Sequence, residues 1–320
     1  MRLVLAPLEG VIDHLVRQLL TELGGYDLCI TEFMRVSDTF MPERSFYKLC
    51  PELHNGGLTP SGVPIRMQLL GQDPHLMSVH ARRAIELGSH GIDLNLGCPS
   101  KMVNSNKGGA VLLKEPEVIY NLVKSMREAI PDDDIFSVKI RLGWEDPQEV
   151  HEITDSIISA GANELTIHAR TKMDGYKKEA IKWEAIAPIA KQDKITLTAN
   201  GEIWTGQDAI NCQEITGCSN LMLGRGALAM PNLGAVIKHN QAPMDYAQLL
   251  QLLSRYSKFE IEGDKGMYYP NRMKQWLVYL RQQFPQAKEL FGLIRTLTKT
   301  DEIIQVLDNE IAKSVRLTNK

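Results

Sequence analysis

Short apolar runs alternate with longer amphipathic segments from the start of the chain to about residue 230. The runs have the length of buried strands, and the segments between them show apolar residues near the 3.6-residue period of a helix. Three clear helical segments are His75–Leu87, Glu117–Ala129 and Glu149–Ser159. The predicted strands are Leu3–Pro7, Leu28–Thr31, Ile65–Leu70, Ile92–Leu96, Ile135–Ile140, Glu164–His168, Ile195–Ala199 and Asn220–Leu223.

This strand–helix alternation predicts an α/β fold, a (β/α)₈ TIM barrel. Eight strands, each usually followed by a helix, fit a closed parallel barrel because the series ends near the roughly 250 residues that such a barrel needs. An open, doubly wound sheet is the alternative.

The pattern changes near Ile237, and the polar segment Lys238–Asp245 with its proline indicates a linker. Four helical segments with short connections follow, typical of a helical bundle. They are Tyr246–Glu262, Tyr269–Gln283, Ala287–Thr296 and Asp301–Arg316. We therefore expect a catalytic barrel domain over residues 1–240 and a small all-α domain over residues 241–320.

Composition narrows the class of protein. Hydrophobic residues make up 43% and charged residues 23% of the chain, as in an ordinary globular protein. Five cysteines, without a Cys-x-x-Cys spacing, argue against a disulfide framework and against a metal site. The chain has neither a signal-peptide pattern nor an apolar run of membrane-spanning length, so we expect a cytoplasmic protein with no membrane partner.

Charge is unevenly distributed. The net charge is −3, but residues 241–320 hold 12 Lys and Arg against 9 Asp and Glu, a balance of +3. A polyanion could dock on this tail. The alternative is that three surplus charges belong to an ordinary solvated helical surface.

Polar residues gather where the predicted strands end, and the active sites of such barrels lie at these carboxyl ends. After the last two strands, Gly201 and Gly224 with Arg225 predict a phosphate cradle, because glycine lets backbone N–H groups approach an anion. The same glycines could instead only make tight turns.

Two strand residues and one loop residue have side chains suited to chemistry. Lys139 is a Schiff-base lysine, a cation beside a flavin ring, or a member of a buried ion pair, and His168 at the next strand end could contact the same ring. Cys98 lies between Gly97 and Pro99 in a predicted turn at the barrel mouth. A thiol with a pKa near 8.5 stays protonated at neutral pH and can act as a general acid.

Six motifs, taken in order, resemble those of the tRNA-dihydrouridine synthases, and the resemblance runs over nearly the whole chain. The stretch Asn95–Lys101 (Asn-Leu-Gly-Cys-Pro-Ser-Lys) is the most specific of them. The others are Ala6–Gly10, Lys139–Gly143, His168–Thr171, Asn200–Ile203 and Gly224–Ala227. The tail segment Arg272–Leu277, with Arg295, resembles the bacterial C subfamily, whose members modify the uridine at position 16 of the tRNA D-loop.

The resemblance implies FMN in the barrel mouth and NADPH, or NADH, as its reductant. Residues implied to contact FMN are Pro7, Leu8, Glu9, Gln68, Lys139 and His168, with Asn200, Gly201, Glu202, Gly224 and Arg225 at its phosphate end. Residues implied to contact uracil or tRNA are Asn95, Arg141, Tyr176, Arg35, Arg272, Lys274 and Arg295. No obligate protein partner is evident, so a monomer is expected.

The resemblance also implies a mechanism, in which C6 of uracil accepts a hydride and Cys98 protonates C5. Three other functions compete with it. They are a flavin-dependent barrel enzyme acting on a free pyrimidine, similar to dihydroorotate dehydrogenase, a lyase with Lys139 as Schiff base, and a non-catalytic tRNA-binding protein.

Overall fold

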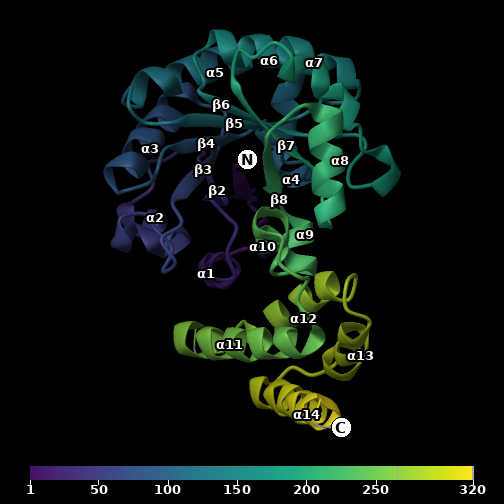
Figure 1. Cartoon of the computed structure of the whole chain (residues 1–320). Helices are drawn as coiled ribbons and strands as arrows, with labels where there is room; N and C mark the ends of the chain where they lie inside the picture. The colour runs from purple at the N-terminus through teal and green to yellow at the C-terminus, as the bar shows by residue number, and fades with distance from the viewer. Residues whose placement is uncertain (265, 319–320) are drawn as a thin grey trace.

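A computed structural model describes residues 1–264 and 266–318. Eight parallel strands close into a barrel in chain order, which confirms the predicted fold and excludes the open sheet (Figure 1). The strands are β1 Leu3–Leu5, β2 Leu28–Arg35, β3 Ile65–Leu70, β4 Ile92–Asn95, β5 Phe136–Arg141, β6 Glu164–His168, β7 Thr196–Asn200 and β8 Asn220–Leu223.

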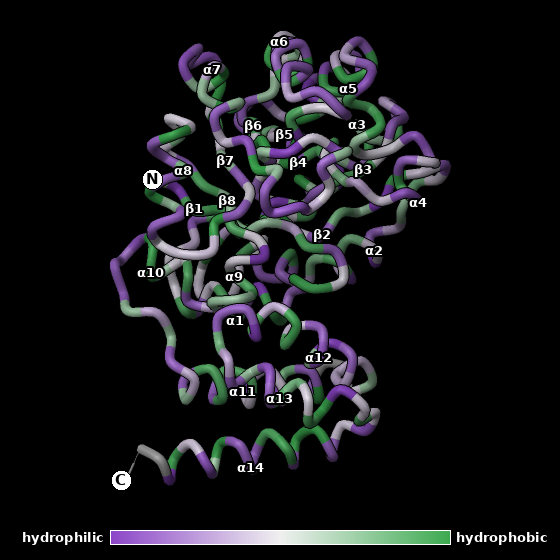
Figure 2. The backbone as a smooth tube through the Cα atoms, turned by 90° about the vertical axis from the view of Figure 1, so that its right-hand side faces the viewer, coloured by the Kyte–Doolittle hydropathy of each residue, from purple (hydrophilic) through white to green (hydrophobic). Residues whose placement is uncertain are grey.

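Helices surround the barrel on its outer face (Figure 1). The α-helices before the tail are α1 His14–Glu22, α2 Glu43–Leu49, α3 Pro74–Glu86, α4 Lys101–Ser105, α5 Pro116–Ala129, α6 Val150–Ser159, α7 Ala187–Ala190, α8 Gly206–Thr216, α9 Arg225–Ala229 and α10 Leu233–His239. Short 3-10 helices are η1 Pro51–Asn55, η2 Gly109–Lys114, η3 Pro147–Glu149, η4 Lys178–Ala180 and η5 Trp183–Ala185. Hydrophobic and hydrophilic residues alternate along the outer helices, as expected for amphipathic helices packed on a sheet (Figure 2).

Three strands differ in length from the prediction: β4 is shorter by one residue, and β1 and β2 differ by more. Strand β1 ends at Leu5, because Pro7 has no backbone N–H to continue the ladder. Strand β2 continues past Thr31 to Arg35, with a register shift against β3 between Ile30 and Phe33. A bulge of this kind lets a strand continue while it re-aims the side chains beyond it.

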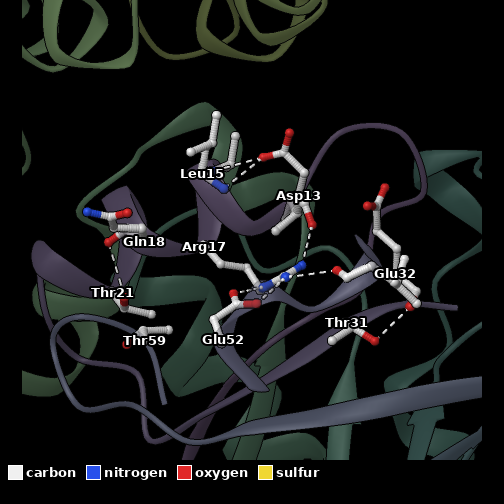
Figure 3. A network of polar contacts seen from close by, with 12 residues as sticks. Asp13, Leu15, Arg17, Gln18, Thr21, Thr31, Glu32, Glu52 and Thr59 are labelled. Carbon is white, nitrogen blue, oxygen red and sulfur yellow. Dashed lines mark hydrogen bonds and ion pairs between the residues drawn. The ribbon is translucent and has the colours of Figure 1, made fainter. Parts of the chain in front are cut away.

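A buried ion pair between Arg17 and Glu52 joins α1 to η1, and Arg17 Nη1 also donates to the Ile12 carbonyl before α1 (Figure 3). Arg17 is fully buried, and its Nε and Nη2 donate to the two carboxylate oxygens of Glu52 at 2.8 and 3.0 Å. Asp13 caps the helix by accepting from the N–H groups of Leu15 and Val16. These contacts fix the segment between β1 and α1, which forms one wall of the pocket described below.

The tail consists of α11 Tyr246–Asp264, α12 Tyr269–Leu280, α13 Pro285–Ile294 and α14 Thr300–Thr318. It packs against the α1 and α9 side of the barrel (Figure 1). The buried Trp276 marks this joint, because its Nε1 donates to the carbonyl of Leu228 in α9 at 3.0 Å and its ring meets Tyr256 edge-on. Among the helices within the described ranges, each is too short or too polar to cross a bilayer.

Candidate active site

One pocket lies at the carboxyl ends of the strands, and every barrel residue predicted for the site lines it except Arg35. These residues are Pro7, Leu8, Glu9, Gln68, Asn95, Cys98, Lys139, Arg141, His168, Tyr176, Asn200, Gly201, Glu202, Gly224 and Arg225. They come from the ends of seven strands, all except β2, and barrel closure brings these ends to one rim.

The floor of the pocket is a row of hydrogen-bonded polar side chains on β3, β4 and β5. Asn95 Nδ2 donates to Gln68 Oε1 at 2.7 Å, and Gln68 Nε2 donates to Asp93 Oδ2 at 2.7 Å. Ser137 Oγ donates to the other oxygen of Asp93. Each amide has a second N–H that finds no acceptor in the described part of the chain, so both can donate to a ligand.

Cys98 differs from the other four cysteines, because they are buried and it is partly exposed. Its loop is held from below by Asn95 Oδ1, which accepts from the N–H groups of Gly97 and Cys98 at 3.0 Å. Gly109 packs so closely behind the loop that a Cβ there would lie 3.0 Å from the Cys98 carbonyl. Burial raises the pKa of the Cys98 thiol, so it is protonated at neutral pH.

His168, Lys139 and Asn200 form a hydrogen-bonded group. Asn200 Nδ2 donates to the Met222 carbonyl at 2.8 Å, so its Oδ1 is the acceptor that meets His168 Nδ1 at 2.9 Å. His168 Nδ1 must therefore bear the hydrogen. Burial holds the pKa of His168 well below its ordinary value, so the ring is neutral and Nε2 is an acceptor. That buried Nε2 has no partner among the described residues, and a ligand N–H or O–H would supply one.

Lys139 adds a cation to this group. Its Nζ donates to Asn200 Oδ1 at 3.3 Å. Burial and the neighbouring Arg141 lower the pKa of Lys139 to about 8, which leaves it mostly charged at neutral pH. The pocket therefore offers a positive charge, a neutral imidazole acceptor and amide donors within one concave surface.

Glu9 lies at the lip of the same pocket, on the loop after β1. Its neighbour Gly10 donates its N–H to the carboxylate of Glu32 on β2. Partial desolvation and the charge of Glu32 raise the pKa of the Glu9 carboxyl to about 7. A carboxyl that titrates near neutrality can be protonated or charged beside a ligand.

Arg141 and Tyr176 form the far wall. Arg141 is buried, its Nε donates to the Gly97 carbonyl at 2.8 Å, and its Nη1 donates to the Thr171 and Gly175 carbonyls. Its guanidinium lies 5.1 Å from the ring of Tyr176, which is 53% exposed. Arg141 thus joins the Cys98 loop to the loop that presents Tyr176.

Glu202 accepts three hydrogen bonds inside the protein. Its Oε1 pairs with Arg170 at 2.9 Å and with Arg225, and its Oε2 accepts from Trp204 Nε1 at 2.8 Å. Arg225, predicted to add charge at a phosphate, has this carboxylate as its partner. Only Nη2 of Arg225 takes part in this pair, and the side chain is 25% exposed at the pocket, so its contact with phosphate stays a prediction.

The glycines after β7 and β8 differ in what they allow. A Cβ on Gly226 would lie 2.0 Å from the Ile203 carbonyl, so packing alone requires glycine there. A Cβ on Gly201, where φ is 123°, would strain the backbone and meet Ile181 at 2.8 Å. A Cβ on Gly224 would only touch Ala6 at 3.4 Å, an ordinary contact distance. Gly224 is thus the one of these three glycines that neither close packing nor a positive φ requires, and it lines the pocket.

Four predicted tRNA contacts lie outside the pocket. Arg35, at the end of β2, lines a separate cleft with Lys107 and Asp38. Arg295 follows α13 in the tail and is exposed.

The other two tail cations already have partners within the protein. Arg272 Nη1 lies 3.1 Å from Asp13 Oδ2 and 2.9 Å from Oε1 of the buried Glu260. Lys274 Nζ donates to the Leu297 carbonyl at 3.0 Å. Arg272 therefore ties the tail to the start of α1.

Sequence reasoning missed several residues of the site. Phe33 and Trp204 line the pocket, Asp93 anchors its floor, and Arg170 is buried behind it. Asp93 is a carboxylate on a buried barrel strand, two residues before Asn95, and this was a usable signal. Arg170 lay inside a quoted motif, but its partner, 32 residues further on, could not be read from spacing.

Comparisons with known proteins place this chemistry in a family. The family described as Dihydrouridine synthase (Dus) matches residues 4–316. A tRNA-dihydrouridine(16) synthase of Vibrio parahaemolyticus is 57% identical over 305 residues, covering 95% of each chain. The protein of that name from Escherichia coli K12 is 51% identical over 313 residues, covering 97% of this chain and 99% of its own.

Solved structures show the same fold at low identity. A variant of NCR from Zymomonas mobilis has a TM-score of 0.51 and 16% identity, over 76% of this chain and 88% of its own. Histamine dehydrogenase from Rhizobium sp. 4-9 has a TM-score of 0.54 and 13% identity, over 75% of this chain and 46% of its own. The chain thus has the TIM-barrel fold, and its match to the family model and to the curated relatives makes it an oxidoreductase. It belongs to the dihydrouridine synthase family.

Proposed function

We propose that this enzyme reduces the C5=C6 bond of uridine to 5,6-dihydrouridine at position 16 of the tRNA D-loop. The observation that supports it best is the partly exposed, protonated Cys98 thiol, held over a pocket that offers unpaired amide donors and a cation. The relatives reported above, whose names specify position 16, support the choice of nucleotide.

FMN suits the residues present. Its ring and ribityl chain have N–H and O–H groups that the unpaired His168 Nε2 could accept, and Lys139 and Gln68 would face electron-rich oxygens. The space at Gly224 and the turn at Gly201 would admit the phosphate. Bound FMN, reduced by NADPH or NADH, would supply the hydride that adds to C6 of uracil.

The residues of the chain then provide the proton and stabilise charge. Negative charge develops on O4 and C5 of uracil as C6 is reduced. Arg141 and Lys139 lower the energy of that charge because they lie in a largely buried pocket. The Cys98 Sγ–H donates the proton to C5, and the loop bonds to Asn95 fix the thiol for this transfer.

The tRNA would be positioned by groups outside the pocket. Every uridine has the same base, so the choice of position 16 must come from how the folded tRNA lies on the enzyme. Arg35, Arg295 and the exposed Tyr176 are the surface groups best placed for this role. Arg272 and Lys274 would act partly through the shape of the tail, given their partners within the protein.

The competing functions are weaker explanations. An enzyme for a free pyrimidine has no use for a tail docked through Trp276 and Arg272. A Schiff-base lyase leaves the Cys98 loop without a role. A non-catalytic tRNA-binding protein leaves the unpaired groups of the pocket unexplained.

Dihydrouridine mapping tests the proposal. We expect tRNA from cells without this gene to lack dihydrouridine at position 16, and plasmid-borne wild type to restore it. Cys98→Ala serves as the control that separates catalysis from binding and should not restore it. Loss of dihydrouridine at another D-loop position would refute the assigned position. Unchanged tRNA would refute the function.

A further inference from the structure

Glu202 has an unusual backbone for its residue type. Its φ is 55°, in the left-handed region that glycine and asparagine favour and other residues rarely adopt. The side chain is 7% exposed and forms part of the pocket wall. Such a conformation costs free energy, so the contacts of the Glu202 carboxylate are the place to look for a role.

The carboxylate is the shared counter-ion of two arginines. Arg170 is fully buried and Arg225 is 25% exposed, and both donate to the same oxygen, Oε1. Burial alone would raise the pKa of the Glu202 carboxyl. The hydrogen bonds from Trp204 and Arg170 outweigh this effect and hold the pKa below its ordinary value. Glu202 is therefore charged at neutral pH. Its removal would leave two cations, one of them buried, without compensation.

Both arginines connect Glu202 to Tyr176 or to the residue that follows it. Arg170 Nε donates to the Lys177 carbonyl at 2.8 Å, directly after Tyr176 in the chain. The Arg225 guanidinium lies 5.0 Å from the Tyr176 ring and 5.3 Å from the Trp204 ring, within range of cation–π contact. One carboxylate thus holds the loop of Tyr176, the cation beneath its ring and the neighbouring indole.

We infer that Glu202 is a positioning residue, which fixes Tyr176 and Trp204 at the mouth of the pocket so that the nucleotide entering from tRNA meets a pre-organised aromatic rim. This inference rests on the proposed function for its substrate. This role needs no contact between the Glu202 side chain and phosphate, because the carboxylate is bonded to Arg170, Arg225 and Trp204.

Glu202→Gln is the direct test, because it keeps the shape but turns one acceptor oxygen into a donor. The new NH₂ group must face either the Trp204 N–H or an arginine, so one contact is lost. We expect flavin content per protein to stay close to wild type. Hydrogen exchange should become faster in residues 172–180, and kcat/KM for tRNA should fall roughly 10- to 100-fold, the scale of a lost charged hydrogen bond.

A double variant with Tyr176 distinguishes a positioning role of Glu202 from a general loss of structure. In a Tyr176→Ala background, Glu202→Gln should cost at most about twofold more in kcat/KM, because contacting groups that act together are not additive. Glu145→Gln is the matched control, since it removes an exposed carboxylate from the loop after β5. It should leave exchange in residues 172–180 unchanged. If Glu202→Gln fails to fold, the milder change Trp204→Phe replaces it. This variant should also speed hydrogen exchange in residues 172–180.

Three results would overturn the inference: loss of flavin from Glu202→Gln, unaltered exchange in residues 172–180, or fully additive effects with Tyr176→Ala. Failure of the proposed function is distinguishable, because wild-type enzyme would then not reduce tRNA uridine. Flavin content and hydrogen exchange would still test the role of Glu202.

Discussion

The barrel mouth and the helical tail use their polar side chains in different ways. In the mouth, His168 Nε2 and the second N–H groups of Gln68 and Asn95 have no partner in the described protein and are available to a ligand. In the tail, Arg272 is held by two carboxylates and Lys274 by a carbonyl. A motif identifies positions, but the partners available after folding decide whether a side chain is available for binding.

The largest expected effect is in the mouth. Cys98→Ala should slow uridine reduction by roughly 10²–10⁴-fold, because the general acid is lost. NADPH should still reduce the flavin, since that half-reaction needs no proton from Cys98. Single-turnover measurements would follow both steps. Cys212→Ala, at a buried thiol in α8, is the control, and wild-type turnover in Cys98→Ala would exclude the thiol as acid.

The same thiol predicts a pH dependence. The acid must be protonated, so the rate of uridine reduction should fall as pH rises through the pKa of Cys98. Loss of the Lys139 charge should lower the rate first, near pH 8, and because burial raises the pKa of Cys98, the decline due to the thiol should follow at higher pH. Single-turnover rates against pH would show it. A decline centred below pH 8 would contradict this assignment.

In the tail, Arg272→Met should lower the free energy of unfolding by about 3 kcal/mol, because the buried Glu260 loses a charged partner. Urea unfolding would measure it. Arg281→Met, at the opposite end of α12 and without an ion pair in the described residues, is the comparison variant. If Arg272→Met weakened tRNA binding but left the free energy of unfolding unchanged, Arg272 would be a tRNA contact and not a structural residue.

Two glycines distinguish a residue that packing requires from one that we expect to lie beside FMN. Gly226→Ala should destabilise the apoprotein by about 1–3 kcal/mol, since its Cβ would meet the Ile203 carbonyl. Gly224→Ala should leave the apoprotein melting temperature close to wild type and still lower FMN occupancy. Thermal unfolding and flavin absorbance after dialysis would distinguish them. Full flavin occupancy in Gly224→Ala would exclude close approach of the cofactor.

The smallest effect concerns Arg295. Arg295→Ala should weaken tRNA binding modestly and reduce the slope of log affinity against log salt by roughly one, as for one lost phosphate contact. Adding Lys274→Ala should weaken binding further. Filter binding at several salt concentrations would test this, with Lys313→Ala on α14 as the control. An unchanged slope in the double variant would remove both cations from the tRNA interface.

Most of the fold could be predicted, because strand and helix periods are local properties of the chain. The bounds of β3, β6 and β8 were predicted to the residue. The extension of β2 was missed, because its bulge depends on pairing with β3. The irregular segment between β6 and β7, with Tyr176, showed no period to interpret.

The sequence by itself determined the barrel, the ends of its strands and the gathering of polar residues at one rim, because topology alone brings parallel strand ends together. Only the tertiary structure decided which of those residues are available. Glu202 and Arg225 stand in the same motifs as Gly201 and Gly224, but Glu202 pairs with Arg225 and with the buried Arg170. An ion pair between distant segments forms only when the two side chains come within about 3 Å of each other. The spacing of residues along the chain cannot predict that distance.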